Sequence, residues 1–280
     1  MRKIFIAIML CAALLVAPAF AQTWPNEQSG STLVTDFGLD TLSGSGWNTV
    51  GGGCGVVSDA TGPLSPPSVV EADYPTGFTA GNAPCTIYYP TANNKELYTG
   101  LWWKASNPWQ QEPLSNMSKI LFWASNTGFD MFCGMNGTGP YTLTCTPEFP
   151  GIANGHLPNS NGDAVGSRNL VGQTTVNMPL GQWHRLEFYY KFSTSATSQD
   201  GIIRWWVDGT LVGDYTTANF PAGNFSEFQI SSTWGGLTST KTENDWYRYD
   251  HVHLSIPPVG GGGGGASGPM GRTKGSRSKK

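Results

Sequence analysis

The fold of this chain is decided by two neighbouring stretches, GQWHRLEFYY at residues 181–190 and GIIRWWVDGTLVGDY at residues 201–215. Apolar and polar side chains alternate along both, the pattern of strands whose successive side chains point to opposite faces of a sheet. Asp208-Gly209 lies between two such runs and is a strong signal for a two-residue hairpin turn. The two stretches therefore predict an antiparallel sheet with one hydrocarbon face and one face of mixed charge and aromatic rings.

Short β-rich runs recur along the chain, separated by clusters of Gly, Pro, Asn and Ser, and the sequence has no long amphipathic helical pattern. Many short strands with polar loops predict an all-β, two-sheet antiparallel β-sandwich (a jelly roll), in one domain from residue 22 to residue 258. The clearest runs are Glu96–Ala105, Lys119–Ser125, Tyr141–Thr146, Trp183–Phe192, Gly201–Val207, Thr210–Tyr215, Phe225–Ser232 and Tyr249–Ile256.

The N-terminus has the pattern of a secretory signal. Arg2 and Lys3 precede an apolar run at residues 4–16, and Ala19-Phe20-Ala21 offers a small-x-small cleavage site. The apolar run is too short for a membrane span and no second run follows, so we expect no transmembrane segment. We expect a secreted, extracellular or periplasmic protein, cleaved near Ala21.

Four cysteines follow the predicted signal, and an even count in an exported chain indicates two disulfides. Of the three pairings, we favour Cys54–Cys85 and Cys133–Cys145, because the second pair brackets a Gly-Thr-Gly-Pro turn at residues 137–140. A cysteine metal site is disfavoured, because the chain has no Cys-x-x-Cys and no His near these positions.

Charge divides the chain into an acidic body and a basic tail. All 19 acidic side chains lie between Glu27 and Asp250 against nine Lys and Arg, a formal charge of −10, which argues against nucleic acid as a partner. Residues 259–280 combine a Gly-rich linker with a basic end, which predicts a disordered tail. That tail either contacts an anionic surface or is simply solvated.

Several motifs between residues 95 and 256 carry a family resemblance: LWWK at 101–104, SKILFW at 118–123, WHR at 183–185, RWWVDG at 204–209 and DHVHLS at 250–255. In this order they resemble the concanavalin-A-like lectin/glucanase superfamily, and more narrowly its heparin-lyase-like and polysaccharide-lyase-like secreted jelly rolls. The resemblance implies the sandwich fold and a polysaccharide partner. It does not choose between binding module and enzyme, because the superfamily includes lectins, hydrolases, lyases and noncatalytic modules.

Strand parity selects a candidate site. If the apolar sets meet between the two sheets, one outer, concave face carries Arg185, Glu187, Tyr189, Arg204, Trp206, His251 and His253, with Lys119 and Trp123 as weaker members. Aromatic rings would pack on sugar C–H faces, and Arg would bind a uronate carboxylate. The alternatives are an Arg204–Glu187 ion pair and a structural His184. We expect Trp102, Trp103, Trp183 and Trp205 in the core.

The leading functional prediction is a secreted, noncatalytic carbohydrate-binding protein. The first alternative is a polysaccharide lyase, in which Arg185 or Arg204 neutralises the uronate, His251 or His253 is the base and Tyr189 the acid. The alginate-lyase motifs Gln-Ile-His and Arg-x-Glu-x-Arg are absent, and so is the Glu-x-Asp-x-Glu strand of a β-glucanase, which disfavours hydrolysis. The second alternative is a structural or adhesive surface protein. We expect no cofactor; a structural Ca²⁺ ion would find loop oxygens at Asp59, Asp73, Asp130 and Asp163.

Overall fold

A computed structural model describes residues 24–128, 130–148, 157–158, 164–165, 170, 172–195, 197–218 and 223–258. These residues form strands and turns and contain no helix. The strands are β1 (Thr32–Phe37), β2 (Asn48–Val50), β3 (Cys54–Ser58), β4 (Ser68–Tyr74), β5 (Thr86–Asn94), β6 (Glu96–Ala105), β7 (Met117–Ser125), β8 (Asp130–Asn136), β9 (Thr142–Glu148), β10 (Leu157–Pro158), β11 (Ala164–Val165), β12 (His184–Lys191), β13 (Gly201–Val207), β14 (Thr210–Ala218), β15 (Phe225–Ser231) and β16 (Asp245–Ile256).

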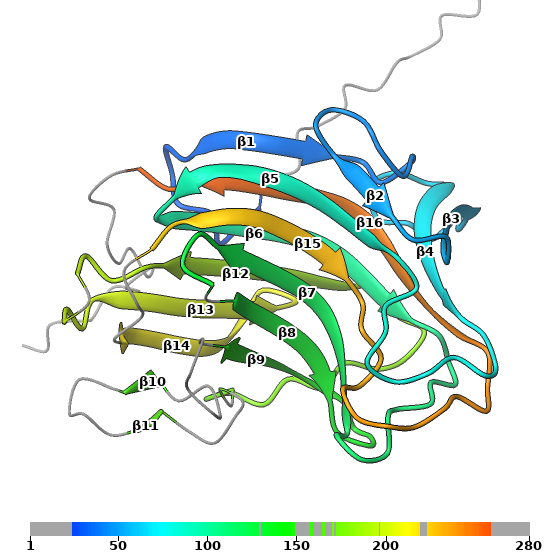
Figure 1. Ribbon diagram of the computed structural model, residues 1–280. Coiled ribbons are helices and arrows are strands. Elements are labelled where there is room, and N and C mark those ends of the chain that lie inside the picture. The colour runs from blue at the N-terminus through cyan, green and yellow to red at the C-terminus, as the bar shows by residue number, and fades with distance from the viewer. Residues whose placement is uncertain are drawn as a thin grey trace, which may run out of the picture.

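Two antiparallel sheets face each other, as the sequence predicts (Figure 1). The larger has eight strands in the order β14-β13-β12-β6-β16-β4-β3, with β1 also paired to β16. The smaller has six, in the order β2-β5-β15-β7-β8-β9. Each of the eight predicted runs coincides with a strand, and β6 and β13 have the predicted bounds. Asp208-Gly209 forms the turn between β13 and β14, with both residues at positive φ.

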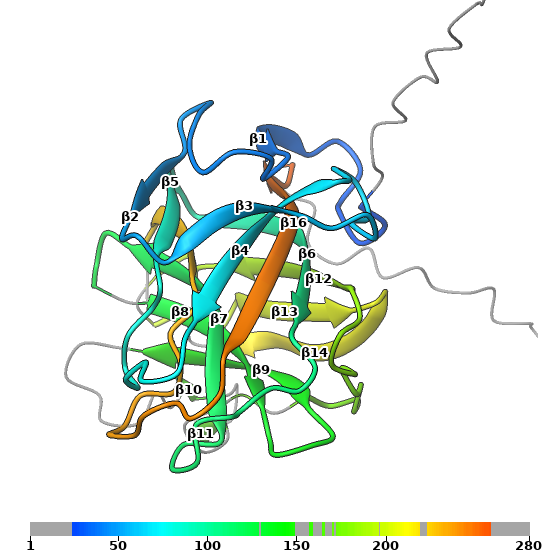
Figure 2. The same cartoon turned by 90° about the vertical axis from the view of Figure 1, so that its right-hand side faces the viewer.

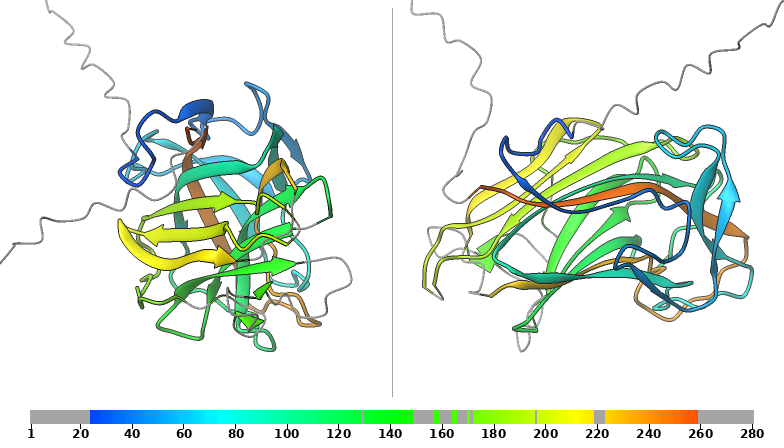
Figure 3. Two further views of the ribbon diagram at one scale, coloured as in Figure 1. Left: turned by 90° about the vertical axis from the view of Figure 1, so that its left-hand side faces the viewer. Right: turned by 90° about the horizontal axis from the view of Figure 1, so that it is seen from above.

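The long strand β16 organises the larger sheet, because its two halves have different neighbours. Figure 2 shows β16, in orange, between β6 and β4. Its first half pairs with β4, whereas Val252–Ile256 pairs with β1, which runs beside it in Figure 3. A β-bulge separates the halves, with His251 at a φ of 58°. This bulge lets β16 leave β4 and accept β1.

The hydrophobic core fills the space between the sheets. Side chains of alternate positions meet there: Leu186, Phe188 and Tyr190 from β12, with Trp205 from β13, pack towards Trp123 and Phe228 of the smaller sheet. The parity prediction for these strands is confirmed. Of the tryptophans expected in the core, Trp103 and Trp205 are buried there. Trp102 and Trp183 are not: both are partly exposed on the outer face of the larger sheet.

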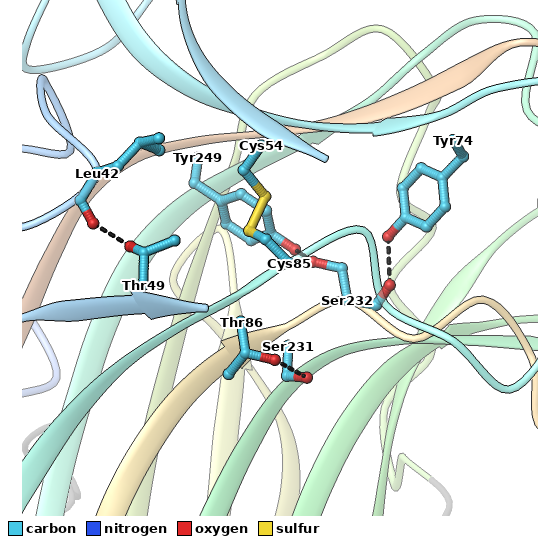
Figure 4. Close-up of a disulfide and its surroundings, with 9 residues drawn as sticks. All are labelled: Leu42, Thr49, Cys54, Tyr74, Cys85, Thr86, Ser231, Ser232 and Tyr249. Carbon is cyan, nitrogen blue, oxygen red and sulfur yellow. Dashed lines mark hydrogen bonds between the residues drawn. A yellow bond between two sulfur atoms is a disulfide. The ribbon is translucent and has the colours of Figure 1, made fainter. Parts of the chain in front are cut away.

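Both predicted disulfides are confirmed. Cys133–Cys145 links β8 to β9 within the smaller sheet. Cys54–Cys85 links β3 of the larger sheet to the residue before β5 of the smaller one, so it joins the two layers (Figure 4). Beside it, the Tyr74 hydroxyl donates to the Ser232 carbonyl and the Tyr249 and Ser232 hydroxyls are hydrogen-bonded. These bonds satisfy two tyrosines whose pKa values burial raises.

The predicted signal (residues 1–21) and basic tail (residues 259–280) lie outside the described residues, so both remain predictions. Among the described residues, no helix has the length and apolar character needed to cross a bilayer.

Candidate functional site

Apart from Lys119 and Trp123, the side chains selected by strand parity gather on one face, the outer face of the eight-stranded sheet. In the β-ladder, Glu187 lies between Trp206 and Gly100, and Gly100 lies opposite His253. One row further along, Tyr189 lies between Arg204 and Tyr98. Residues from four adjacent strands, β13, β12, β6 and β16, thus form one patch.

This patch is not the open, concave face that we expected, because residues 24–28 (here called the N-terminal strap) lie across it. The Trp24 indole sits directly above Gly100: a Cβ added there would lie 2.5 Å from the ring. As a result, Glu187 is fully buried and Tyr189 is 2% exposed. The strap therefore closes this half of the face, and a polymer does not reach these groups while it is in place.

Polar contacts fix the strap to the sheet. Asn26 donates to the buried carboxylate of Glu187, which also accepts a hydrogen bond of 3.0 Å from the Tyr98 hydroxyl. Glu27 lies 3.1 Å from His253 Nε2. Burial and the neighbouring carboxylate of Glu187 raise the pKa of Tyr98 well above its usual range. The strap thus adds partners to buried groups that also pair within the sheet, where Glu187 lies 3.6 Å from Arg185 Nε.

The two histidines proposed as bases belong to an ion cluster on β16 and β1. His253 lies between Glu27 and Asp36, with Nδ1 at 3.4 Å from Asp36, and His251 also contacts Asp36. Burial disfavours the charged imidazole, but hydrogen bonds to Asp36 and Glu27 outweigh it and raise the pKa of His253. Burial likewise opposes ionisation of Asp36, but its bonds to the two histidines hold its pKa well below the usual range.

The remaining predicted lyase groups also have protein partners. Arg204 pairs with Asp214 at 2.7 Å rather than with Glu187, so the Arg204–Glu187 ion pair that we considered does not form. The Tyr189 hydroxyl donates to Glu96, and burial together with that carboxylate raises the pKa of Tyr189. His184 is structural, as expected: Nδ1 contacts Asp208 and Nε2 contacts the Pro179 carbonyl oxygen.

Trp123 and Lys119 do not belong to this patch, and placing them there was wrong. Trp123 is fully buried between the sheets and donates from Nε1 to Thr99 Oγ1. Lys119 lies on the outer face of the six-stranded sheet, with Nζ 5.4 Å from the Phe122 ring centroid. A β-bulge between Lys119 and Leu121 reverses the alternation, so these two predicted neighbours point to opposite faces.

The outer face of the six-stranded sheet is the second candidate site. A row of side chains crosses its middle strands: Tyr88 on β5 pairs with Gln229 on β15, and Gln229 pairs with Phe122 on β7. All three are partly exposed. Among the described residues, the Tyr88 hydroxyl has no hydrogen-bond partner, and Gln229 donates to Glu227 on the same strand. With Lys119 above Phe122, the face combines rings, an amide, a hydroxyl, an ammonium and a carboxylate.

Sequence reasoning missed Tyr88, Gln229 and Glu227. For the two β15 residues a signal was present, because Glu227 and Gln229 alternate with the apolar Phe228 and Ile230. Tyr88 carries a weaker signal, since its strand contains Pro90 and Thr91, which obscure the alternation.

Of the loop acids considered for Ca²⁺, the described ones (Asp59, Asp73 and Asp130) do not form a metal-binding cluster. Asp59 forms ion pairs with Lys104 and Arg248. Burial alone would raise the pKa of Asp59, but its hydrogen bonds outweigh that effect and hold the pKa well below the usual range. Asp163 lies outside the described residues. Within the described part of the chain, no three His, Cys, Asp or Glu side chains are arranged to hold a metal ion.

Comparison with known proteins identifies the fold. No protein-family model and no curated protein sequence matches this chain. Among solved structures, a PL-14 alginate lyase from Aplysia kurodai superposes with a TM-score of 0.57 at 10% identity, over 81% of this chain and 100% of that one. Alginate lyase vAL-1 from Chlorella virus gives 0.52 at 14% identity, over 80% and 100%, and alginate lyase Aly36B gives 0.50 at 14%, over 68% and 81%. The chain therefore has the concanavalin-A-like jelly-roll fold that polysaccharide lyases also have.

Proposed function

We propose that the protein is a secreted carbohydrate-binding jelly roll and that it binds polysaccharide on the outer face of the six-stranded sheet. The observation that carries this proposal is the partly exposed row of Tyr88, Gln229 and Phe122 across three neighbouring strands. Aromatic faces pack against the C–H faces of sugar rings, and an amide exchanges hydrogen bonds with their hydroxyls. The two disulfides support an oxidising, extracellular setting.

The predicted site on the opposite sheet has less to offer a polymer. Its side chains are the right chemical types, but the strap and their ion-pair partners already occupy them. On the six-stranded sheet, by contrast, the Tyr88 hydroxyl retains its hydrogen-bonding capacity among the described residues. A hydroxyl that can still form hydrogen bonds beside aromatic rings is what a sugar site needs, so we assign binding to this face.

Lyase activity is the second candidate, favoured by the position of Tyr88 directly opposite Gln229. In β-elimination the uronate carboxylate must be neutralised, for which the Gln229 amide and the Lys119 ammonium are suited. A base then takes the C5 proton, the C4–O bond breaks, a C4–C5 double bond forms and an acid protonates the departing oxygen. In this scheme the Tyr88 hydroxyl is the proton-transfer group.

One pair of substitutions separates binding from catalysis. The protein is incubated with alginate, heparin, hyaluronan and glucuronan, and both retention on the glycan and ultraviolet absorbance of the new double bond are measured. For a binding module, Tyr88→Ala weakens retention more than Tyr88→Phe, which keeps the ring and removes only the hydroxyl, and no absorbance develops. For a lyase, Tyr88→Phe abolishes product while retention survives.

Leu33→Ala is the control, because Leu33 is 58% exposed on the other sheet. Retention that falls equally in the control and in Tyr88→Ala contradicts a site on this face. Assembly of the wild type into fibres, without affinity for any sugar, would favour a structural protein instead.

A further inference from the structure

Two partly exposed tryptophans lie on the outer face of the eight-stranded sheet, beyond the half that the strap covers. We call Trp183 and Trp246 the tryptophan platform; Trp102, the third partly exposed tryptophan of this face, packs against the cluster under the strap and is not part of it. Trp246 belongs to β16, and Trp183 comes immediately before β12. One buried ammonium, Lys104 Nζ, lies 4.6 Å from the Trp183 ring centroid and 5.7 Å from that of Trp246. The two indoles therefore lie side by side.

The rings are fixed in place by the groups beneath them. Lys104 is only 6% exposed whereas Trp183 is partly exposed, so the indole covers the ammonium and turns its other face outward. The Trp183 indole N–H donates to Thr61 Oγ1 at 3.1 Å, which sets the rotation of the ring. The guanidinium of Arg248 lies 4.1 Å from the Trp246 ring centroid. Aromatic groups held in their binding orientation lose little conformational entropy when a ligand arrives.

Charge on the platform is balanced, which selects the class of ligand. Lys104 pairs with Asp59, and Arg248 pairs with both Asp59 and Glu71. Two cations and two anions leave no net charge to attract a polyanion. At the rim, exposed Asp73 lies opposite Trp246 in the ladder and can accept hydrogen bonds from hydroxyl groups. Flat rings with a hydroxyl acceptor and no excess of positive charge are complementary to an uncharged sugar chain rather than to a polyanion.

We propose that the tryptophan platform is a second carbohydrate-binding site, specific for an uncharged glycan and independent of the site on the six-stranded sheet. The two sites lie on opposite faces of the sandwich, so one molecule would link two glycan chains. This proposal goes beyond the function proposed above and does not depend on it, since the two faces share no residue.

Retention on uncharged polysaccharides (insoluble glucan, mannan and xylan) tests the site in the full-length protein. We expect the double variant Trp183→Ala/Trp246→Ala to lose at least about tenfold in affinity, as for the removal of two aromatic anchors. Tyr88→Ala/Gln229→Ala, altered only on the opposite face, should bind these glycans like the wild type. Leu211→Ala is the matched control, because Leu211 is an apolar residue 38% exposed on the same sheet.

Hydroxyl-radical footprinting of the unaltered protein keeps the test valid if the double variant does not fold. A bound uncharged glycan should protect peptides containing Trp183 and Trp246, and alginate should not. The proposal is overturned if the wild type retains none of the uncharged glycans, if only the Tyr88 variant loses binding, or if the platform peptides stay unprotected. A dimer that dissociates in the Trp183 variant would assign the face to a second copy of the chain and also overturn it.

Discussion

Replacing Gly100 with alanine should detach the N-terminal strap. Gly100 lies in the middle of β6, and the added Cβ would approach Trp24 Cε3 to 2.5 Å and Cδ2 to 2.7 Å. The indole cannot yield by a small shift, because it is 2% exposed and packs against the His253 ring at a centroid distance of 5.8 Å. The alternative to a distorted sheet is that Trp24 leaves its site and the strap opens.

The cost follows from the area that the indole buries. A tryptophan buries about 150–250 Å², which at about 25 cal/mol per Å² amounts to about 4–6 kcal/mol. Residual burial in the unfolded chain reduces this to about 3–5 kcal/mol. In a domain of this size each kcal/mol corresponds to about 2–4 °C in Tm, so we expect Gly100→Ala to melt about 6–20 °C below the wild type.

Thermal melting combined with hydrogen exchange of residues 24–31 measures the effect. Gly55→Ala in β3 is the matched control, because a Cβ there meets no atom within 4 Å. The double variant Trp24→Ala/Gly100→Ala is decisive: with the indole gone, the extra methyl has room, so its stability should equal that of Trp24→Ala alone. The reasoning fails if Gly100→Ala has the same Tm as Gly55→Ala and its strap amides stay protected from exchange. It also fails if the stability losses of Trp24→Ala and Gly100→Ala add in the double variant.

Three further predictions concern stability. Removing Cys54–Cys85, with a separation of 31 residues, should cost about 3.7 kcal/mol and removing Cys133–Cys145, with a separation of 12, about 2.8 kcal/mol, as urea unfolding of the paired serine variants will show. The raised pKa of His253 stabilises the fold fully below its ordinary value of 6.5 and less as pH rises through the raised pKa. Urea midpoints measured from pH 5 to 9 should therefore decline less in His253→Gln than in the wild type, and the remaining decline comes in part from His184, whose pKa is also raised. Gly213→Ala should cost at least about 3 kcal/mol in the same assay, because its Cβ would lie 2.1 Å from the fully buried ring of Trp205.

The aromatic strands could be predicted because every second position along them is bulky and apolar. In β12 and β13 these positions identify the strand and the face turned to the main core, although Tyr189 and Trp206 also place rings on the other face. The first part of the chain has no such signal: β2 is three residues long, and β3 and β5 contain Gly or Pro. These strands form because they can pair with the edges of the other strands in the two sheets. This is a tertiary effect that cannot be read from the local sequence.

The candidate site was predicted in its placement but not in its accessibility. Parity correctly brought Glu187, Tyr189 and Trp206 to one face, because the pleat alone determines that relation. What covers a face depends on segments distant in sequence, and Trp24 lies 76 residues before Gly100 in a stretch without strand character. The Lys119 error has a different origin, since a single bulge inverts parity and leaves no mark in the residue pattern.

The strap also explains how one sheet face presents two chemically different halves. Where it lies, the buried carboxylate of Glu187 accepts a hydrogen bond from Asn26 of the strap, so this half has the properties of a protein interior. Beyond it, the Trp183 indole lies over Lys104 and the Trp246 indole packs against Arg248, and both indoles are partly exposed. In both halves aromatic residues lie over polar groups of the sheet. Only at the tryptophan platform are those aromatic rings themselves exposed to solvent and able to contact a ligand. A ligand is therefore expected at the tryptophan platform, and the strapped half should respond to sugar only in variants such as Gly100→Ala that open it.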